Sequence, residues 1–103
     1  MEKSPYKVIY NELPEKTTLR FSGQLIINHI EKISALVNEK LSAEKDLLME
    51  IDNPDSVDVT FIQLLLSIKA TVKANGKEVS IKAEIKDEIK TLIKNSGFNY
   101  VLN

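Results

Sequence analysis

The side chains that could carry out chemistry in this chain are few and widely separated. His29 is the only histidine among the 103 residues, and there is no cysteine. A catalytic triad would have to join His29 to a serine and a distant carboxylate, and no nucleophile motif accompanies it. Zinc sites draw on several histidine or cysteine ligands, so a single histidine serves them poorly. We therefore predict that the protein is not an enzyme and binds no cofactor, and that His29 is a partly exposed helix residue.

Asp52, Asp55 and Asp58 have a spacing that superficially resembles a calcium loop. However, Asn53-Pro54 and the missing terminal glutamate do not match the EF-hand pattern. Aspartate and asparagine are common in turns, which makes a solvated turn the stronger interpretation. A phosphate-binding loop is also unsupported, because the chain has only 3 glycines and they are far apart. The sequence therefore predicts no metal site and no nucleotide site.

The composition is that of an ordinary globular chain, with 43% hydrophobic and 28% charged residues. The formal net charge of −1 provides no general attraction to nucleic acid or to anionic lipid. Residues 1–10 do not resemble a secretory signal, and no segment approaches the roughly 18 apolar residues of a membrane span. The lack of cysteine fits a reducing compartment. We predict one cytoplasmic domain over residues 1–103 that neither binds nucleic acid directly nor inserts into a membrane.

Four segments have the residue pattern of strands. Residues 6–10 alternate as an edge strand does, and residues 17–21 resume the pattern before Ser22-Gly23 is expected to turn the chain. Residues 47–51 form an almost continuous apolar run, which is typical of a central strand covered on both faces. Residues 79–83 make a further strand. A last edge segment is suggested by Phe98, Tyr100 and Leu102.

Apolar residues recur at helical spacing in three segments, residues 26–41, 60–72 and 85–93. Asn75-Gly76 supplies a left-handed stop after the second helix. The predicted fold class is therefore α/β, a mixed sheet with helices packed against it in the order β-β-α-β-α-β-α, with an optional final strand. The predicted core includes Leu48, Ile51, Leu65 and Ile68.

This order and one local pattern resemble the STAS domain family, which includes the anti-sigma-factor antagonists. Residues 48–51, a turn and residues 57–66 resemble the strand, loop and helix signature of that family. Residues 22–26 resemble its glycine-containing turn, and residues 75–77 resemble its turn after the second helix. The resemblance spans residues 6–102 and implies a STAS-like fold with a regulatory, protein-binding role.

The resemblance also implies a switch position at the start of the second helix. In the family, an Asp is followed by a Ser or Thr that a partner kinase phosphorylates. Asp58 matches the Asp, but Val59 stands at the hydroxyl position and Phe61 where a glycine often follows. Thr60 retains a hydroxyl one residue later and is the candidate phosphosite, so the switch is either lost or moved to Thr60. The alternative interpretation of Thr60 is the N-cap of this helix, and that of Asp58 is a loop or cap carboxylate.

A partner-binding surface at the same place follows from the resemblance. Its predicted members are Asn53, Asp55, Ser56, Asp58, Val59, Thr60 and Ile62. The implied partner is a serine-kinase-type anti-sigma factor or a related signalling protein. The alternative is that the chain serves as the STAS subunit of a membrane lipid-transport ATPase. In either case the chain itself is expected to be a monomer or a weak dimer.

Overall fold

The computed structural model describes residues 4–41 and 44–95 and has the predicted α/β architecture. The elements in chain order are β1 (Tyr6–Glu12), β2 (Lys16–Leu25), α1 (Ile27–Lys40), β3 (Asp46–Asp52), β4 (Ser56–Val57), α2 (Val59–Ala74), β5 (Val79–Glu84) and α3 (Asp87–Asn95). The sheet order is β1-β2-β3-β5, with β1 antiparallel to β2 and the other neighbours parallel. The two-residue β4, which the sequence did not predict, pairs with the end of β2. The expected segment at residues 98–102 lies outside the described residues.

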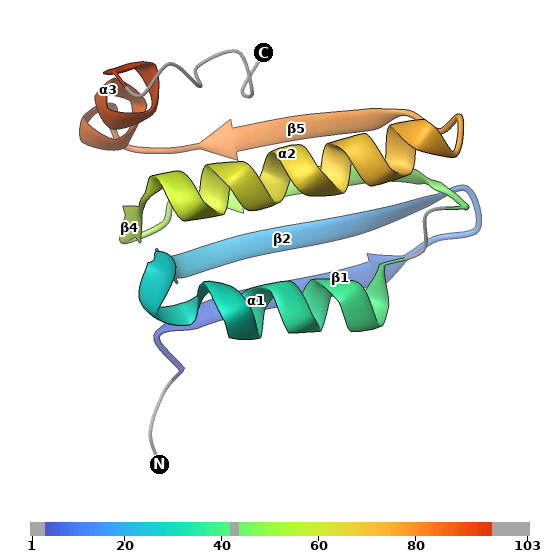
Figure 1. The fold of residues 1–103 in the computed structure, drawn as a ribbon, viewed down its shortest axis with the longest axis horizontal. Helices are drawn as coiled ribbons and strands as arrows, with labels where there is room; N and C mark the ends of the chain where they lie inside the picture. Colours follow the sequence, from blue (N-terminus) through green and yellow to red (C-terminus); the bar gives the residue numbers. More distant parts are fainter. Residues whose placement is uncertain (1–3, 42–43, 96–103) are drawn as a thin grey trace.

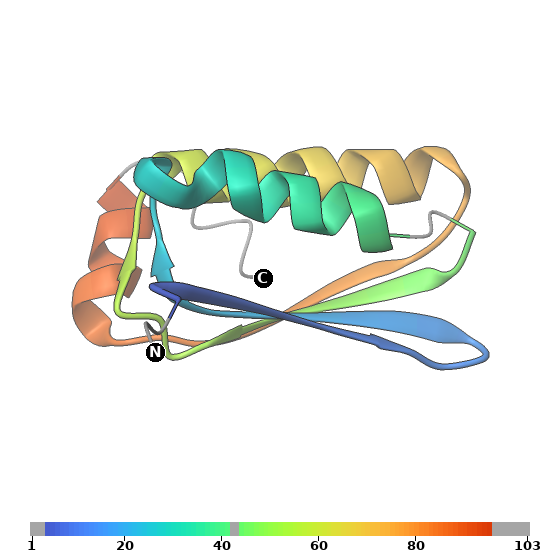
Figure 2. The same ribbon diagram turned by 90° about the horizontal axis from the view of Figure 1, so that it is seen from below.

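Both long helices lie on the same face of the sheet. Figure 1 shows α1 and α2 side by side and running in the same direction, and Figure 2 shows the opposite face of the sheet without a helix. The arrangement follows from the two strand-helix-strand units, because each helix must return the chain to the start of a parallel neighbour. The starts of α1 and α2 therefore meet at one end of the molecule.

This one-sided layering corrects the prediction for β3. Leu47, Met49 and Ile51 are buried beneath the helices, whereas Leu48 and Glu50 alternate onto the open face and are only partly buried. Leu48 is therefore not in the core, and β3 is covered on one face only. The prediction took the apolar run as a sign that both faces of β3 are covered. Successive side chains of a strand point to opposite faces, so an apolar run does not show that helices cover both.

The core lies between the sheet and the two long helices, and the predicted Ile51, Leu65 and Ile68 belong to it. Phe61 of α2 meets Phe21 of β2 edge to face, with their ring centroids 5.2 Å apart. Such aromatic pairs add to the stability that burial provides. The first turn of α2 is thereby fixed to the middle of the sheet.

Gly23 does not turn the chain as predicted, because β2 continues through it to Leu25. Its φ of +85° lies in the region that favours glycine, and a Cβ built there would lie 2.5 Å from the carbonyl oxygen of Pro5. Gly23 thus allows the residue before β1 to approach the backbone of β2. Asn75-Gly76 does act as predicted, since α2 ends at Ala74 and Gly76 has a φ of +76°.

Candidate partner-binding site

Backbone hydrogen bonds fix the loop between β3 and α2 at both ends. The Asn53 N–H donates to the carbonyl oxygen of Glu84 at 2.6 Å, which ties the loop to the end of β5. The Asp55 N–H donates to the Gly23 carbonyl at 2.8 Å, and β4 then pairs with the last residues of β2. Asn53 itself has a φ of +40°, a conformation that asparagine tolerates better than most residues. The loop therefore presents its side chains from a defined backbone.

Asp58 caps the starts of both long helices. Its Oδ1 accepts the Thr60 N–H at 3.0 Å and also the Thr60 hydroxyl, which makes Asp58 the N-cap of α2. Its Oδ2 accepts the N–H of Ile27 at 2.8 Å, from the first residue of α1. The N-cap position of α1 is Ile26, whose side chain has no acceptor, so Asp58 supplies the missing cap from 31 residues away.

This geometry corrects the interpretation of Thr60 as the N-cap. Helix α2 begins at Val59, so Thr60 lies within its first turn and donates its hydroxyl proton to the true cap, Asp58. The interpretation of Thr60 placed the cap two residues late, whereas the interpretation of Asp58 as a cap carboxylate is confirmed. Aspartate and threonine both favour the cap position, and the sequence has one on each side of Val59, namely Asp58 and Thr60.

The hydrogen bonds at Asp58 also shift its titration. Burial raises the pKa of the Asp58 carboxyl. Hydrogen bonds from the Thr60 hydroxyl and from the N–H groups of Ile27, Thr60 and Phe61 lower the pKa, and together they outweigh burial. The net result is a pKa below the ordinary value of 3.8. The folded protein therefore favours the ionised carboxylate, which can accept all of these donors at once.

We expect Asp58→Asn to lower the free energy of unfolding by about 1–3 kcal/mol at neutral pH, because the amide keeps one acceptor oxygen but turns the other into an NH2 donor, which leaves Ile27 or Thr60 without its acceptor. Because the folded-state pKa is depressed, the ionised carboxylate contributes its full stability above the unfolded-state pKa and loses it as the pH falls through the folded-state value. The stability difference between wild type and Asp58→Asn should therefore shrink below about pH 4. Urea unfolding between pH 2.5 and 7 measures it. A constant difference across this range would contradict the capping role of the charge.

The structure brings six of the seven predicted surface residues to accessible positions. Asn53, Asp55 and Val59 are exposed, and Ser56, Asp58 and Thr60 are half-buried. Ile62 is the exception, since it is only 1% exposed and packs in the core. Its inclusion was wrong, because both Phe61 and Ile62 are buried at the start of α2. A partner could not reach Ile62 without moving the helix.

One exposed residue beside this loop was missed. Ile27 at the start of α1 is 64% exposed, and Val59 at the start of α2 is 42% exposed. The Ile27 N–H is bonded to Asp58, the residue before Val59, so the two aliphatic side chains belong to neighbouring helix starts. The apolar stripe predicted for α1 ran through Ile26 and left Ile27 aside. An apolar residue next to such a stripe is the signal that could have identified it.

A groove of about 700 Å³ continues from these helix starts between α1 and α2. We call it the helix groove; it is lined by Ile27, Ile30, Glu31, Ser34, Ala35, Asn38, Thr60, Gln63 and Leu64. The side chains of Ile30 and Leu64 also pack against the core, which holds these two lining residues in place. The helix groove and the loop before α2 meet at Thr60.

His29 lies at the same end of the molecule but in a structural setting. Its Nε2 lies 3.1 Å from the Oε1 of Gln24, and its ring lies 5.4 Å from that of Tyr6. No carboxylate or hydroxyl is recorded within hydrogen-bonding distance of His29 among the described residues. The arrangement packs the start of α1 against β1 and β2.

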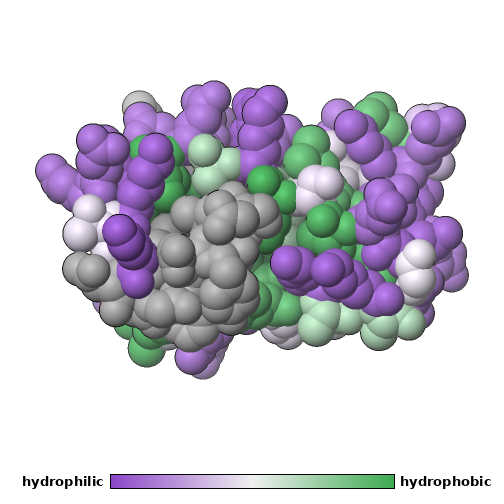
Figure 3. Space-filling model, turned by 90° about the horizontal axis from the view of Figure 1, so that it is seen from above, coloured by the Kyte–Doolittle hydropathy of each residue, from purple (hydrophilic) through white to green (hydrophobic). Residues whose placement is uncertain are grey.

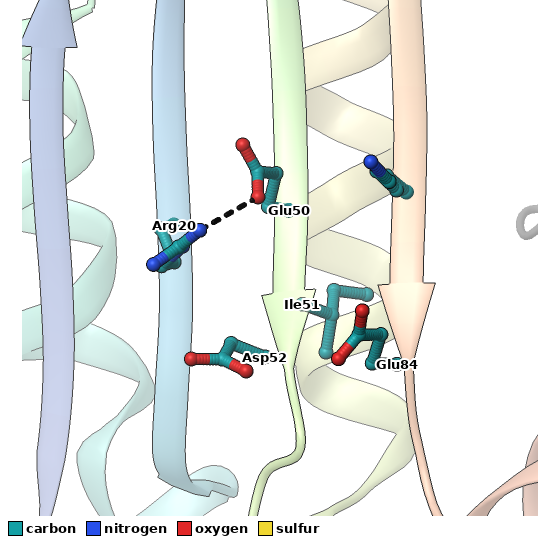
Figure 4. A pocket seen from close by; sticks show the side chains of 6 residues that line it. Arg20, Glu50, Ile51, Asp52 and Glu84 are labelled. Atoms are coloured by element: carbon teal, nitrogen blue, oxygen red, sulfur yellow. Dashed lines mark hydrogen bonds and ion pairs between the residues drawn. The ribbon is translucent and has the colours of Figure 1, made fainter.

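The open face of the sheet carries a group of charged side chains on β2, β3 and β5. Figure 4 shows Arg20 of β2 reaching Glu50 of β3, an ion pair of 3.1 Å, with Asp52 and Glu84 further along their strands. The hydrogen bond and charge of Glu50 raise the pKa of Arg20. Lys82 completes the lining of a shallow pocket of about 130 Å³. Cross-strand pairs of this kind are typical of a solvated sheet surface and contribute little stability.

The β5 side of the molecule presents mixed character. In Figure 3 hydrophilic side chains dominate its margins, and hydrophobic atoms are visible between them. The partly buried Val79, Ile81, Ala83 and Ile85 pack against the core in this part of the structure. Within residues 4–41 and 44–95, no three His, Asp or Glu side chains are grouped so that they could hold a metal ion.

The family model for the STAS domain matches residues 7–103, nearly the whole chain. The chain belongs to the STAS domain family. A solved structure with the same fold is the antisigma-factor antagonist STAS domain from Rhodobacter sphaeroides, with a TM-score of 0.57 and 17% sequence identity. The similarity covers 77% of this chain and 87% of that one. No curated protein matches the chain in sequence.

These findings confirm the predicted family and fold. The mixed sheet with its three helices is consistent with the STAS fold. In the part of the chain that the structure describes, no helix combines the length and hydrophobicity needed to cross a membrane.

Proposed function

We propose that this STAS domain is a non-enzymatic regulatory module that binds a serine-kinase-type anti-sigma factor or a related signalling protein. The observation that carries the proposal is the exposed side chain of Val59 at the start of α2. Asp58 caps this helix start, and backbone hydrogen bonds hold the loop before it in place. The similarity to an antisigma-factor antagonist supports this class of partner. The proposed contact surface comprises Asn53, Asp55, Ser56, Asp58, Val59 and Thr60.

The fixed backbone of this surface favours binding. A loop that is already ordered loses little conformational entropy when a partner docks. Val59 has an exposed aliphatic side chain that would lose its contact with water when a partner binds. The exposed Asp55 supplies a charge at the edge of the same surface. An apolar centre with a polar rim is the usual composition of a protein interface.

Val59→Asp should weaken the binding of the anti-sigma factor at least tenfold, or about 1.4 kcal/mol, because it places an unpaired charge in the contact. The measurement is titration calorimetry with each serine-kinase-type anti-sigma factor encoded in the same genome. Ile9→Asp is the matched control, since Ile9 is 41% exposed, close to the 42% of Val59, but lies in β1 of the sheet. Equal affinities for wild type and Val59→Asp would reject this surface. Binding to a lipid-transport ATPase instead would transfer the role to the alternative partner.

We further propose that partner binding is constitutive. Val59 has no hydroxyl, and the hydroxyl of Thr60 is half-buried and engaged by Asp58. A phosphate on Thr60 would place roughly two negative charges next to the Asp58 carboxylate. It would also remove the hydroxyl proton that Thr60 donates to Asp58. Thr60 is therefore poorly suited to replace the phosphorylated hydroxyl that the family has at the position of Val59.

Incubation with the bound kinase and ATP should therefore leave the intact mass of the wild-type protein unchanged. Thr60→Ala is expected to have nearly the wild-type affinity, whereas Thr60→Glu is expected to bind more weakly because it adds charge at the interface. A phosphate on the wild type that is missing from Thr60→Ala would establish Thr60 as the switch and overturn constitutive binding.

A further inference from the structure

The helix groove is poor in charge compared with the rest of the molecule. Glu31 is the one ionisable side chain that lines it among the described residues, although 28% of the chain is charged. The other lining residues are uncharged: four are aliphatic (Ile27, Ile30, Ala35 and Leu64) and four are polar (Ser34, Asn38, Thr60 and Gln63). Depletion of charge distinguishes the centre of a protein interface from ordinary surface.

The outward side of α2 shows the same depletion. Residues 59–68 contain no charged residue, and the exposed positions Val59, Gln63, Ser67 and Thr71 follow one another at four-residue intervals. A surface helix normally carries its charges on the side away from the sheet. The open face of the sheet, by contrast, has Arg20, Glu50 and Lys82 in a single cross-strand row. The outward side of α2 therefore has the composition of a surface that is covered by another protein.

We propose that the helix groove accommodates one amphipathic helix of a partner protein, with an aliphatic face against Ile30 and Leu64 and a lysine or arginine opposite Glu31. The proposal deepens the proposed function, on which it rests, because the groove joins the Val59 surface at Thr60. Two parallel helices with a groove between them accept a third helix by the same packing that binds helical peptides elsewhere.

Charge complementarity favours a different chain over a second copy. Glu31 is exposed and has no ion pair recorded among residues 4–41 and 44–95. A second copy packed groove to groove would bring another Glu31 and no basic lining residue, so like charges would meet in an apolar setting. A partner helix with one basic side chain would instead neutralise Glu31.

The parallel arrangement of α1 and α2 also sets the direction of the partner helix. Both helices present the negative ends of their dipoles at the far end of the groove and the positive ends at the Ile27 and Thr60 end, where Asp58 caps both. The negative C-terminal end of a bound helix is best placed there. The groove lining follows α1 from Ile27 to Asn38, a helical stretch of about 18 Å at 1.5 Å per residue, so the bound segment should be roughly 12 residues long.

The test uses the full chain in its native cells with a photo-crosslinking amino acid at Gln63 or at Asn38. Both positions are exposed in the groove, Gln63 near the helix starts and Asn38 near the far end of α1. Ser80 on the open face is the control position. Mass spectrometry of the crosslinked peptides is expected to find one amphipathic helix containing a lysine or arginine. Gln63 should capture its C-terminal half and Asn38 its N-terminal half.

A second measurement addresses the charge. Glu31→Lys should reduce the crosslinked product at least tenfold, and changing the captured basic residue to glutamate should restore it. Glu39→Lys makes the same charge change outside the groove lining and should have no effect. Crosslinks to a second copy, to lipid, or at no more than the Ser80 level would each overturn the proposal. So would an undiminished product with Glu31→Lys.

Failure of this inference can be told apart from failure of the proposed function. If Val59→Asp weakens the anti-sigma factor while Gln63 and Asn38 capture no helix, the function stands and the groove inference is false. If a helix is captured from a protein that is not an anti-sigma factor or a related signalling protein, the groove inference stands and the proposed partner is wrong.

Discussion

Replacing Phe61 by alanine is expected to lower the free energy of unfolding by about 3–5 kcal/mol, the range measured for phenylalanines cut back in cores. Phe61 is completely buried and loses its edge-to-face contact with Phe21 when the ring is removed. A domain of this size is stable by roughly 5–15 kcal/mol, so the variant should be close to unfolding at physiological temperature.

Chemical denaturation followed by far-UV circular dichroism measures this loss. Gln63→Ala is the matched control, because Gln63 is exposed two residues further along the same helix and should change stability by less than about 0.5 kcal/mol. A similarly small effect for Phe61→Ala would mean that the inward face of α2 is wrongly assigned.

Gly23→Ala is expected to cost roughly 3 kcal/mol, because two penalties coincide at this position. The φ of +85° is unfavourable for alanine, and the new Cβ would lie 2.5 Å from the Pro5 carbonyl oxygen. Since that atom belongs to the backbone, relief requires the start of β1 to move away from β2. The loss should therefore be accompanied by faster amide hydrogen exchange in β1.

Gly76→Ala separates the two penalties. Gly76 has a similar φ of +76°, but a Cβ there would meet nothing within 4 Å. It should cost only about 1 kcal/mol, the penalty of the left-handed conformation. If both alanine variants lost the same stability, the close approach of Pro5 would have no energetic role.

The fold could be predicted from the sequence because strand and helix periodicities are local signals. Ile33 and Val37 of α1, and Leu65 and Ile68 of α2, are buried as their spacing indicated. The errors arose where a residue type fits two environments. Leu48 is apolar yet lies on the open face, since the pattern of β3 cannot show which face the helices cover.

The candidate site was predictable only in part. The turn residues and the start of α2 carried the family pattern, so the sequence alone pointed to Asp55, Asp58 and Val59, and the structure places all three at accessible positions. The contact between Asp58 and Ile27 depends on how two helices converge in space, and no local spacing encodes a bond across 31 residues. The helix groove was missed for the same reason, because its lining comes from two helices that are separated by β3 in the chain.

The shared cap at Asp58 has a consequence for the birth of the protein on the ribosome. When the residues of α1 first emerge, the carboxylate that will receive the Ile27 N–H has yet to be synthesised, because it lies 31 residues later. Chains are made at about 5–20 residues per second, which is slow compared with the microsecond formation of a helix. The first turn of α1 must therefore fray during synthesis until Asp58 arrives, and the two helix starts should become ordered in one event instead of in chain order.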